Sequence, residues 1–207
     1  MSFPSTGILD NFNRGNESPV DGNWSPFYGD LKAQLVSNAI IHLDTSDGSS
    51  MYWNPNTYQD SENYYTITTK GTTDFSIFTR MGGDPINALD GYRGYHSIPL
   101  SLVRIQRLDD SVKTTLGADI TSVTFANGDG FGFEMIGSTI TTYKRISGSW
   151  AGIGNRSDAT YASGYIGLRG GDDTTWVFDD FGGGTVVVSI PVAILKSGKS
   201  FEHMLVR

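Results

Sequence analysis

Aromatic side chains gather in two turn-rich segments whose composition is typical of a sugar-binding surface. Trp53 and Tyr58 belong to the first segment, and Tyr92 and Tyr95 belong to the second. A flat ring can lie against a sugar while neighbouring amides and hydroxyls form hydrogen bonds. These four residues are therefore the predicted glycan contacts. The alternative is that they are core residues or cross-strand pairs, as alternate aromatics on a strand usually are.

Acidic residues near the two ends of the chain indicate a possible cation site. Hard cations such as calcium take several oxygen ligands, which Asp10, Asp180, Asp172 and Asp173 could supply. The competing interpretation is that Asp10 and Asp180 accept hydrogen bonds from backbone N–H groups in turns. Their spacing is not a metal motif by itself. Calcium is accordingly a candidate ion, and no cofactor is required.

The pattern of carboxylates and histidines does not predict catalysis. Glycoside hydrolysis needs two carboxylates that flank the scissile bond. The four glutamates are scattered, and Glu134 alternates with apolar neighbours as a solvated strand residue would. No two of the three histidines have the spacing of metal ligands. The sequence therefore predicts a protein that is not an enzyme.

Composition excludes several further classes. The chain has 207 residues, no cysteine and a net charge of −7. The absence of cysteine excludes disulfides and thiolate metal sites, and an acidic chain lacks the basic stripe that a nucleic-acid partner requires. No run of apolar residues is long enough for a membrane span, and the N-terminus has no signal-peptide pattern. We therefore expect neither nucleic-acid binding nor membrane insertion.

Period-2 alternation is the main structural signal. Phe131, Phe133 and Met135 alternate with small or polar residues, and similar runs recur between turns rich in Gly, Asn and Asp. About a dozen short strands can be counted between Leu31 and Val188, and no helical stripe occurs. The sequence predicts an all-β fold, with two antiparallel sheets packed as a jelly-roll sandwich over residues 1–184.

The C-terminal segment, residues 185–207, differs in amino-acid composition from the rest of the chain. Residues 186–195 are almost entirely apolar apart from Ser189, and Pro191 cannot donate a hydrogen bond to a sheet. We expect this segment to be a β arm that docks on a neighbouring subunit, either in a homo-oligomer or on another protein of the same assembly. The alternative is one more strand of its own sandwich.

Three separated motifs resemble one family. Residues 8–14 and 22–24 resemble the "DxFNR … G-x-W" opening of concanavalin-like, laminin-G-type jelly rolls, which are common in minor tail proteins of phages that infect actinobacteria. Residues 136–141 with 158–168 resemble the middle of these modules, and residues 179–184 resemble their closing motif. In such sandwiches the first and last strands lie side by side, so Phe12 and Phe181 should be buried together.

The resemblance implies a virion component on a phage tail or capsid, assembled in the host cytoplasm and exposed after release. It implies a non-enzymatic structural and adhesion role, with other virion proteins and host cell-wall glycan as partners. The alternative is a stand-alone bacterial carbohydrate-binding module or lectin. A glycosidase or lyase is a third possibility that the scattered carboxylates disfavour.

Overall fold

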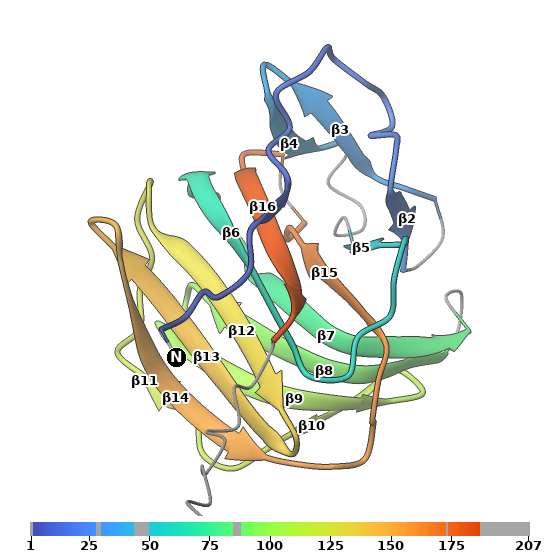
Figure 1. Cartoon of the computed structure of the whole chain (residues 1–207). Helices are drawn as coiled ribbons and strands as arrows, with labels where there is room; N and C mark the ends of the chain where they lie inside the picture. Colours follow the sequence, from blue (N-terminus) through green and yellow to red (C-terminus); the bar gives the residue numbers. More distant parts are fainter. Residues whose placement is uncertain (1, 28–29, 44–49, 85–87, 173, 187–207) are drawn as a thin grey trace, which may run out of the picture.

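A computed structural model describes residues 2–27, 30–43, 50–84, 88–172 and 174–186 (Figure 1). These residues form strands and no helix, so none of them forms a helix that could cross a membrane. The predicted arm lies outside the described residues from residue 187 onward. Thr185 ends the last strand, and Val186 is still buried against the sandwich.

The strands form two antiparallel sheets, as the alternation predicted. Sheet A has the order β14-β13-β12-β6-β16-β4-β3, with β1 also paired to β16. Its strands are β1 (Ile8–Asp10), β3 (Ala33–Val36), β4 (Ala39–His42), β6 (Ser61–Thr69), β12 (Gly130–Ile136), β13 (Thr139–Ile146), β14 (Ser149–Ser157) and β16 (Val177–Thr185).

Sheet B has the order β10-β9-β8-β7-β15-β5-β2, with β11 also paired to β9. Its strands are β2 (Trp24–Pro26), β5 (Ser50–Trp53), β7 (Phe75–Asp84), β8 (Ala88–Ser97), β9 (Leu102–Asp109), β10 (Val112–Thr115), β11 (Ile120–Thr121) and β15 (Tyr165–Arg169). In Figure 1 the long strands β7, β8 and β9 curve beneath the strands of sheet A.

Tight turns set the register of the hairpins. Residues 37–38 join β3 to β4, and residues 110–111 join β9 to β10. All four residues have positive φ, between 49° and 67°. Two-residue loops of this kind match the right-handed twist of the strands that they join.

The core between the sheets is largely aromatic. Phe131, Phe133 and Met135 are fully buried, which confirms the face predicted for this strand. The Phe75 ring lies at the centre, 4.7 Å from the Trp176 ring and 5.5 Å from the Phe131 ring, in edge-to-face geometry. Such contacts add about 1 kcal/mol each to the free energy gained by burial.

The first and last strands close the sandwich as predicted. Ile8 pairs with Gly182, and Asp10 pairs with Phe181, in antiparallel register. Phe12 and Phe181 have no exposed surface. The segment that contains β1 therefore covers part of one edge of β16, and β4 pairs with Val177 and Phe178 farther along that same edge.

Candidate functional site

The outer face of sheet B, which points away from the core, carries a group of polar side chains. A Cβ atom added to Gly94 would lie 3.0 to 3.3 Å from core side chains, so Gly94 faces inward. Alternation along β8 then directs Arg93 and Tyr95 outward. On the neighbouring strand β9, Arg104 pairs with Tyr95 and Gln106 pairs with Arg93, so these two residues share that outer face.

A pocket of about 480 Å³ opens on this face, which is within the usual range for small-ligand sites. The strands β8, β9, β10 and β15 supply its floor, and the segments before β7 and after β15 supply its rim. Its lining is mainly polar and charged: Thr72, Thr73, Asp74, Arg93, Tyr95, Pro99, Arg104, Gln106, Lys113, Arg169, Gly171 and Asp172.

Tyr95 is held in the pocket by a fixed hydrogen bond. Its hydroxyl donates to one carboxylate oxygen of Asp74, and the other oxygen accepts the backbone N–H of Ile98 at 3.0 Å. Burial raises the pKa of Tyr95, and the hydrogen bond to Asp74 raises it further, so the phenol stays protonated at neutral pH. The Arg93 guanidinium lies over the ring, 4.4 Å from its centroid.

Two basic residues of the lining already have acidic partners. Arg104 donates two hydrogen bonds of 2.9 Å to Asp119, and Arg169 donates one of 2.9 Å to Asp172. Arg93 differs, because its only hydrogen bond in the described structure runs from Nε to the hydroxyl of Ser76, at 2.7 Å. The pocket therefore holds both neutralised and uncompensated positive charge.

Three of the four predicted sugar contacts are core residues, which corrects that assignment. Trp53, Tyr58 and Tyr92 are 8%, 7% and 0% exposed. The Trp53 ring packs edge-on against Trp24, with 5.5 Å between ring centroids. A ring that is this deeply buried offers no free face for stacking on a sugar. Tyr95 is the predicted contact that lines the pocket.

The hydroxyl of the buried Tyr92 takes part in a hydrogen-bond network with Asp158. It donates to Oδ1 of Asp158 at 2.6 Å, while Oδ2 of Asp158 accepts from Arg107 at 2.9 Å. Burial raises the pKa of Tyr92 to about 12. This ring therefore stabilises the loop after β14 and has no surface to offer a ligand.

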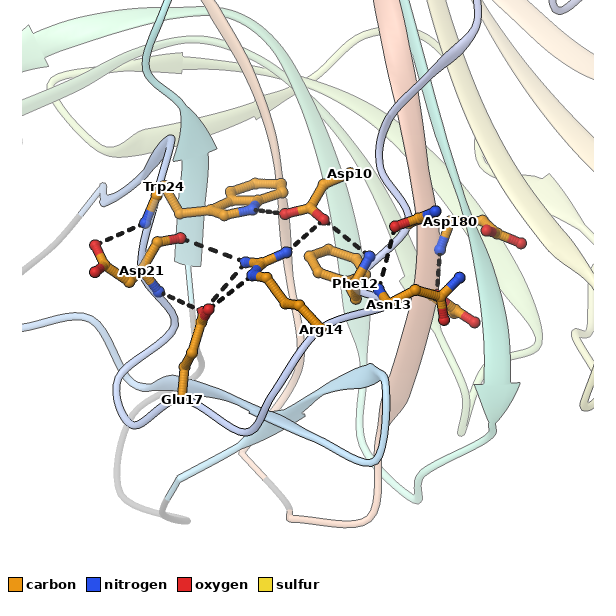
Figure 2. A network of polar contacts seen from close by, with 11 residues as sticks. Asp10, Phe12, Asn13, Arg14, Glu17, Asp21, Trp24 and Asp180 are labelled. Atoms are coloured by element: carbon orange, nitrogen blue, oxygen red, sulfur yellow. Dashed lines mark hydrogen bonds and ion pairs between the residues drawn. The ribbon is translucent and has the colours of Figure 1, made fainter.

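Asp10 is the centre of a hydrogen-bond network in the N-terminal segment (Figure 2). Its Oδ1 accepts the backbone N–H of Phe12 at 2.8 Å and Nη1 of Arg14 at 2.7 Å, and its Oδ2 accepts Nε1 of Trp24 at 2.9 Å. Arg14 is held in turn by Glu17, with 2.7 Å between Nε and Oε1. The opening motif is therefore a structural device that fixes the loop between β1 and β2.

This network does not suit calcium, because its carboxylate oxygens already accept N–H groups and an arginine stands beside them. Asp10 does lie near Asp180, because it pairs with Phe181, the next residue along β16. Asp172 lies apart, in the pocket on sheet B, and Asp173 is outside the described residues. The described residues contain no group of three or more His, Cys, Asp or Glu side chains that could hold a metal.

Two glutamates meet on the outer face of sheet A, where a catalytic pair would have to be considered. Glu62 and Glu134 are cross-strand partners, and burial raises the pKa of Glu134, with a smaller effect from Glu62. However, Oε1 of Glu62 accepts the backbone N–H of Ser5 at 2.6 Å and the hydroxyl of Thr6 at 2.7 Å. Glu62 is fully buried beneath this segment, so a glycosidic bond cannot reach the pair.

No family model and no curated protein matches the sequence. The structure is similar to the carbohydrate-binding module CBM66 from Bacillus subtilis, with a TM-score of 0.59 and 15% identity over 77% of this chain and 91% of that one. It is also similar to the exoplasmic/lumenal domain of VIP36 in its calcium-bound form, with a TM-score of 0.64 and 13% identity over 89% and 92% of the two chains. A legume lectin-like domain from Entamoeba histolytica has a TM-score of 0.54 and 12% identity over 80% and 91%. The chain thus has the jelly-roll sandwich fold of the concanavalin and legume-lectin type.

Proposed function

We propose that this chain is a non-enzymatic glycan-binding module that a phage particle carries on its tail or capsid. The observation that supports glycan binding best is the pocket on the outer face of sheet B. It places the half-buried ring of Tyr95 beside Arg93, Gln106 and Arg104, all within one concave surface of ligand size. Rings and convergent hydrogen-bonding groups of this kind are what a sugar requires.

The fold adds support without deciding the ligand. CBM66 is a carbohydrate-binding module by name, and the domain from Entamoeba histolytica is lectin-like by name. Because jelly rolls serve many functions, the site has to carry the functional argument. The occluded Glu62–Glu134 pair and the hydrogen-bonded Asp10 favour a role without catalysis and without a required metal.

The virion part of the proposal depends on three motifs, at residues 8–14 with 22–24, 136–141 with 158–168, and 179–184. They resemble jelly-roll modules that are common in phage minor tail proteins. A module on a tail or capsid is present in several copies, so weak binding at each site adds up to firm attachment. The alternative is a stand-alone bacterial lectin or carbohydrate-binding module, which the same pocket would serve equally well. Electron microscopy of particles labelled with an antibody to this chain distinguishes the two.

Retention on host cell-wall polysaccharide tests glycan binding. Tyr95→Ala removes the ring from the pocket and should weaken retention at least about tenfold, because stacking and the positioning of Arg93 are both lost. Tyr143→Ala is the matched control, since Tyr143 stacks on Phe3 at 3.9 Å on the outer face of sheet A. If both variants are retained like the wild type while their melting curves remain cooperative, the pocket is not the glycan site.

A further inference from the structure

The pocket on sheet B carries positive charge in an acidic protein. Its lining has four basic residues and two acidic ones, whereas the whole chain has a net charge of −7. Asp119 neutralises Arg104, and Asp172 neutralises Arg169. Arg93 and Lys113 form no ion pair with any carboxylate of the described residues. The excess positive charge therefore belongs to these two side chains.

Arg93 is a charged residue that is buried in the floor of the pocket. It is 5% exposed, and its Nη1 and Nη2 atoms donate no hydrogen bond to an acceptor in the described structure. A buried guanidinium without a carboxylate partner is unfavourable unless some other group compensates its charge. The Tyr95 ring lies against the guanidinium, and the negative charge of Asp74 also favours the charged form of Arg93, but neither makes an ion pair with it.

The basic residues also influence one another. Burial lowers the pKa of Arg93 to about 9, and the positive charge of Arg169 contributes to that shift. Partial burial of its ammonium group likewise lowers the pKa of Lys113, with further effects from Arg93 and Arg169. Arg93, Lys113 and Arg169 therefore lie close enough to disfavour one another's charge, although Asp172 pairs with Arg169 and Asp74 belongs to the same lining. An anion bound between them would relieve this repulsion.

Gln106 supplies a neutral polar group at the same place. It pairs with Arg93 across β8 and β9, is 7% exposed, and its Oε1 has no hydrogen-bond partner in the described structure. Its amide nitrogen makes only a long contact of 3.4 Å with the hydroxyl of Thr115. A buried, unpaired amide oxygen beside a pocket is suited to accept a hydroxyl from a ligand.

We propose that the pocket on sheet B binds an oxyanion group of an acidic glycan, with Arg93 and Lys113 as its charge partners and Gln106 as an acceptor for a sugar hydroxyl. The oxyanion is the carboxylate of a uronic acid or the phosphodiester of a phosphate-linked glycan, because the same donors suit both. This inference rests on the proposed glycan-binding function and specifies its ligand class. It also separates this site from one that recognises neutral sugars through aromatic stacking alone.

The experiment measures, by affinity electrophoresis at low salt, how strongly each of three polymers retards the intact protein. The polymers are polygalacturonate, its fully methyl-esterified and therefore neutral form, and poly(glycerol phosphate). We expect retardation by at least one charged polymer and little by the ester, with the stronger of the two charged polymers identifying the source of the oxyanion. Retardation should decrease as salt rises, because the contact is ionic.

Substitutions then assign the charge partners. Lys113→Gln should weaken binding to the charged polymer about fivefold, as expected for one partly exposed ion pair. Arg93→Gln should weaken it more than about tenfold, and Arg93→Lys, which retains a positive charge, should recover part of the affinity. Lys70→Gln makes the same charge change at an exposed position outside the pocket and should leave binding unchanged.

The outcomes also distinguish failure of the oxyanion assignment from failure of the proposed glycan-binding function. Equal binding of the neutral and charged polymers, or equal effects of Lys113→Gln and Lys70→Gln, overturns the oxyanion assignment while glycan binding stands. Binding of the neutral polymer alone has the same meaning. A wild-type chain that binds none of the three polymers and no host cell-wall polysaccharide counts against both proposals. Because Lys113 is exposed, its variant decides the question even if Arg93→Gln does not fold.

Discussion

Asp10 shows how one side chain can stabilise a segment that has little regular structure of its own. Its carboxylate accepts hydrogen bonds from Phe12 and Arg14, in the loop after β1, and from Trp24, at the start of β2. Phe12 has a φ of 52°, a left-handed conformation that is unfavourable for a bulky residue. The carboxylate therefore stabilises a strained backbone and satisfies a buried indole N–H at the same time.

Replacing Asp10 tests this role. Asp10→Ala should lower the free energy of unfolding by about 2–3 kcal/mol, because the Trp24 N–H and the Phe12 N–H both lose their acceptor. Asp10→Asn keeps one acceptor oxygen and should cost less. Urea denaturation of the two variants measures the difference. Added calcium should not change either curve, and a calcium-dependent midpoint in the wild type alone would show that Asp10 is a metal ligand after all.

His96 should make stability depend on pH. The ring is 1% exposed between Phe75 and Phe125, its Nε2 lies 3.1 Å from the carbonyl of Val123, and its Nδ1 is unpaired. Burial lowers the pKa of His96 from 6.5 to about 4, despite the opposing hydrogen bond to Val123. The folded state thus binds fewer protons than the unfolded state between these values. The contribution of the neutral His96 to the free energy of unfolding is fully present above pH 6.5. It falls by about 3 kcal/mol as the pH drops toward 4.

The measurement for His96 is the urea midpoint at several pH values. His96→Gln keeps an N–H donor for Val123 but does not titrate, so its stability should vary much less between pH 4 and 6.5. Below pH 4 both proteins should lose stability together, because the folded-state pKa of Asp158 is about 2 and its hydrogen bonds to Tyr92, Thr160 and Arg107 depend on the charged form. Parallel curves across the whole range would refute the assignment to His96.

At the scale of elements, alternation was informative wherever a strand has one buried face. The pattern of Phe131, Phe133 and Met135 predicted the orientation of β12 correctly. The paired end motifs predicted the contact between β1 and β16. Strand β10 is exposed along its whole length, so it has no apolar alternation to detect. Strands β1 and β2 are only three residues long, too short for a period-2 signal, and the count that began at Leu31 missed them.

The same limit explains why the candidate site could be predicted only in part. Aromatic residues at alternate positions of a strand fit a core face and a sugar platform equally well, so the sequence did not distinguish the predicted glycan contacts Trp53 and Tyr92 from core residues. Their burial becomes visible only when the second sheet is placed against them. The pocket was missed because Arg93, Gln106 and Lys113 come from three strands. The sequence signal that could have indicated the pocket is the alternation of the polar residues Arg104 and Gln106 with Val103 and Ile105.

The N-terminal segment is an element whose removal should be costly. Deleting residues 1–14 removes β1, the fully buried Phe12 and the ring of Phe3, which lies between Tyr143 and Trp150. We expect a loss of about 4 kcal/mol or more from Phe12 alone, together with an exposed edge on β16. Thermal melting and dye binding to exposed apolar surface measure these effects. Deleting only residues 1–2 is the control, and equal melting temperatures for the two deletions would contradict the closure of the sandwich by β1.

At the scale of the whole molecule, the apolar C-terminal run of the sequence requires a surface against which it can be buried. The described sandwich is closed at Val186, which is 5% exposed and donates its backbone N–H to the carbonyl of Asp60 at 3.0 Å. Sheet A ends at β14, whose outer edge has no partner strand among the described residues. An edge strand of nine residues can pair with an extended segment from another chain. The sequence-based prediction that residues 187–207 dock on a neighbouring subunit is compatible with this geometry and stays a prediction.

Truncation after Val186 tests the arm hypothesis at this scale. If the segment anchors the module to a neighbour, the truncated chain folds with a nearly unchanged urea midpoint, because every described strand and the Val186–Asp60 hydrogen bond remain. It should also become a concentration-independent monomer in light scattering, whereas the full chain self-associates or joins particles. Ile190→Asp with Ile194→Asp in the full chain is the matched variant, since it keeps the length but makes the run too polar to be buried. A truncated chain that fails to fold would place the run inside its own sandwich, because a strand that completes a core cannot be removed without exposing that core.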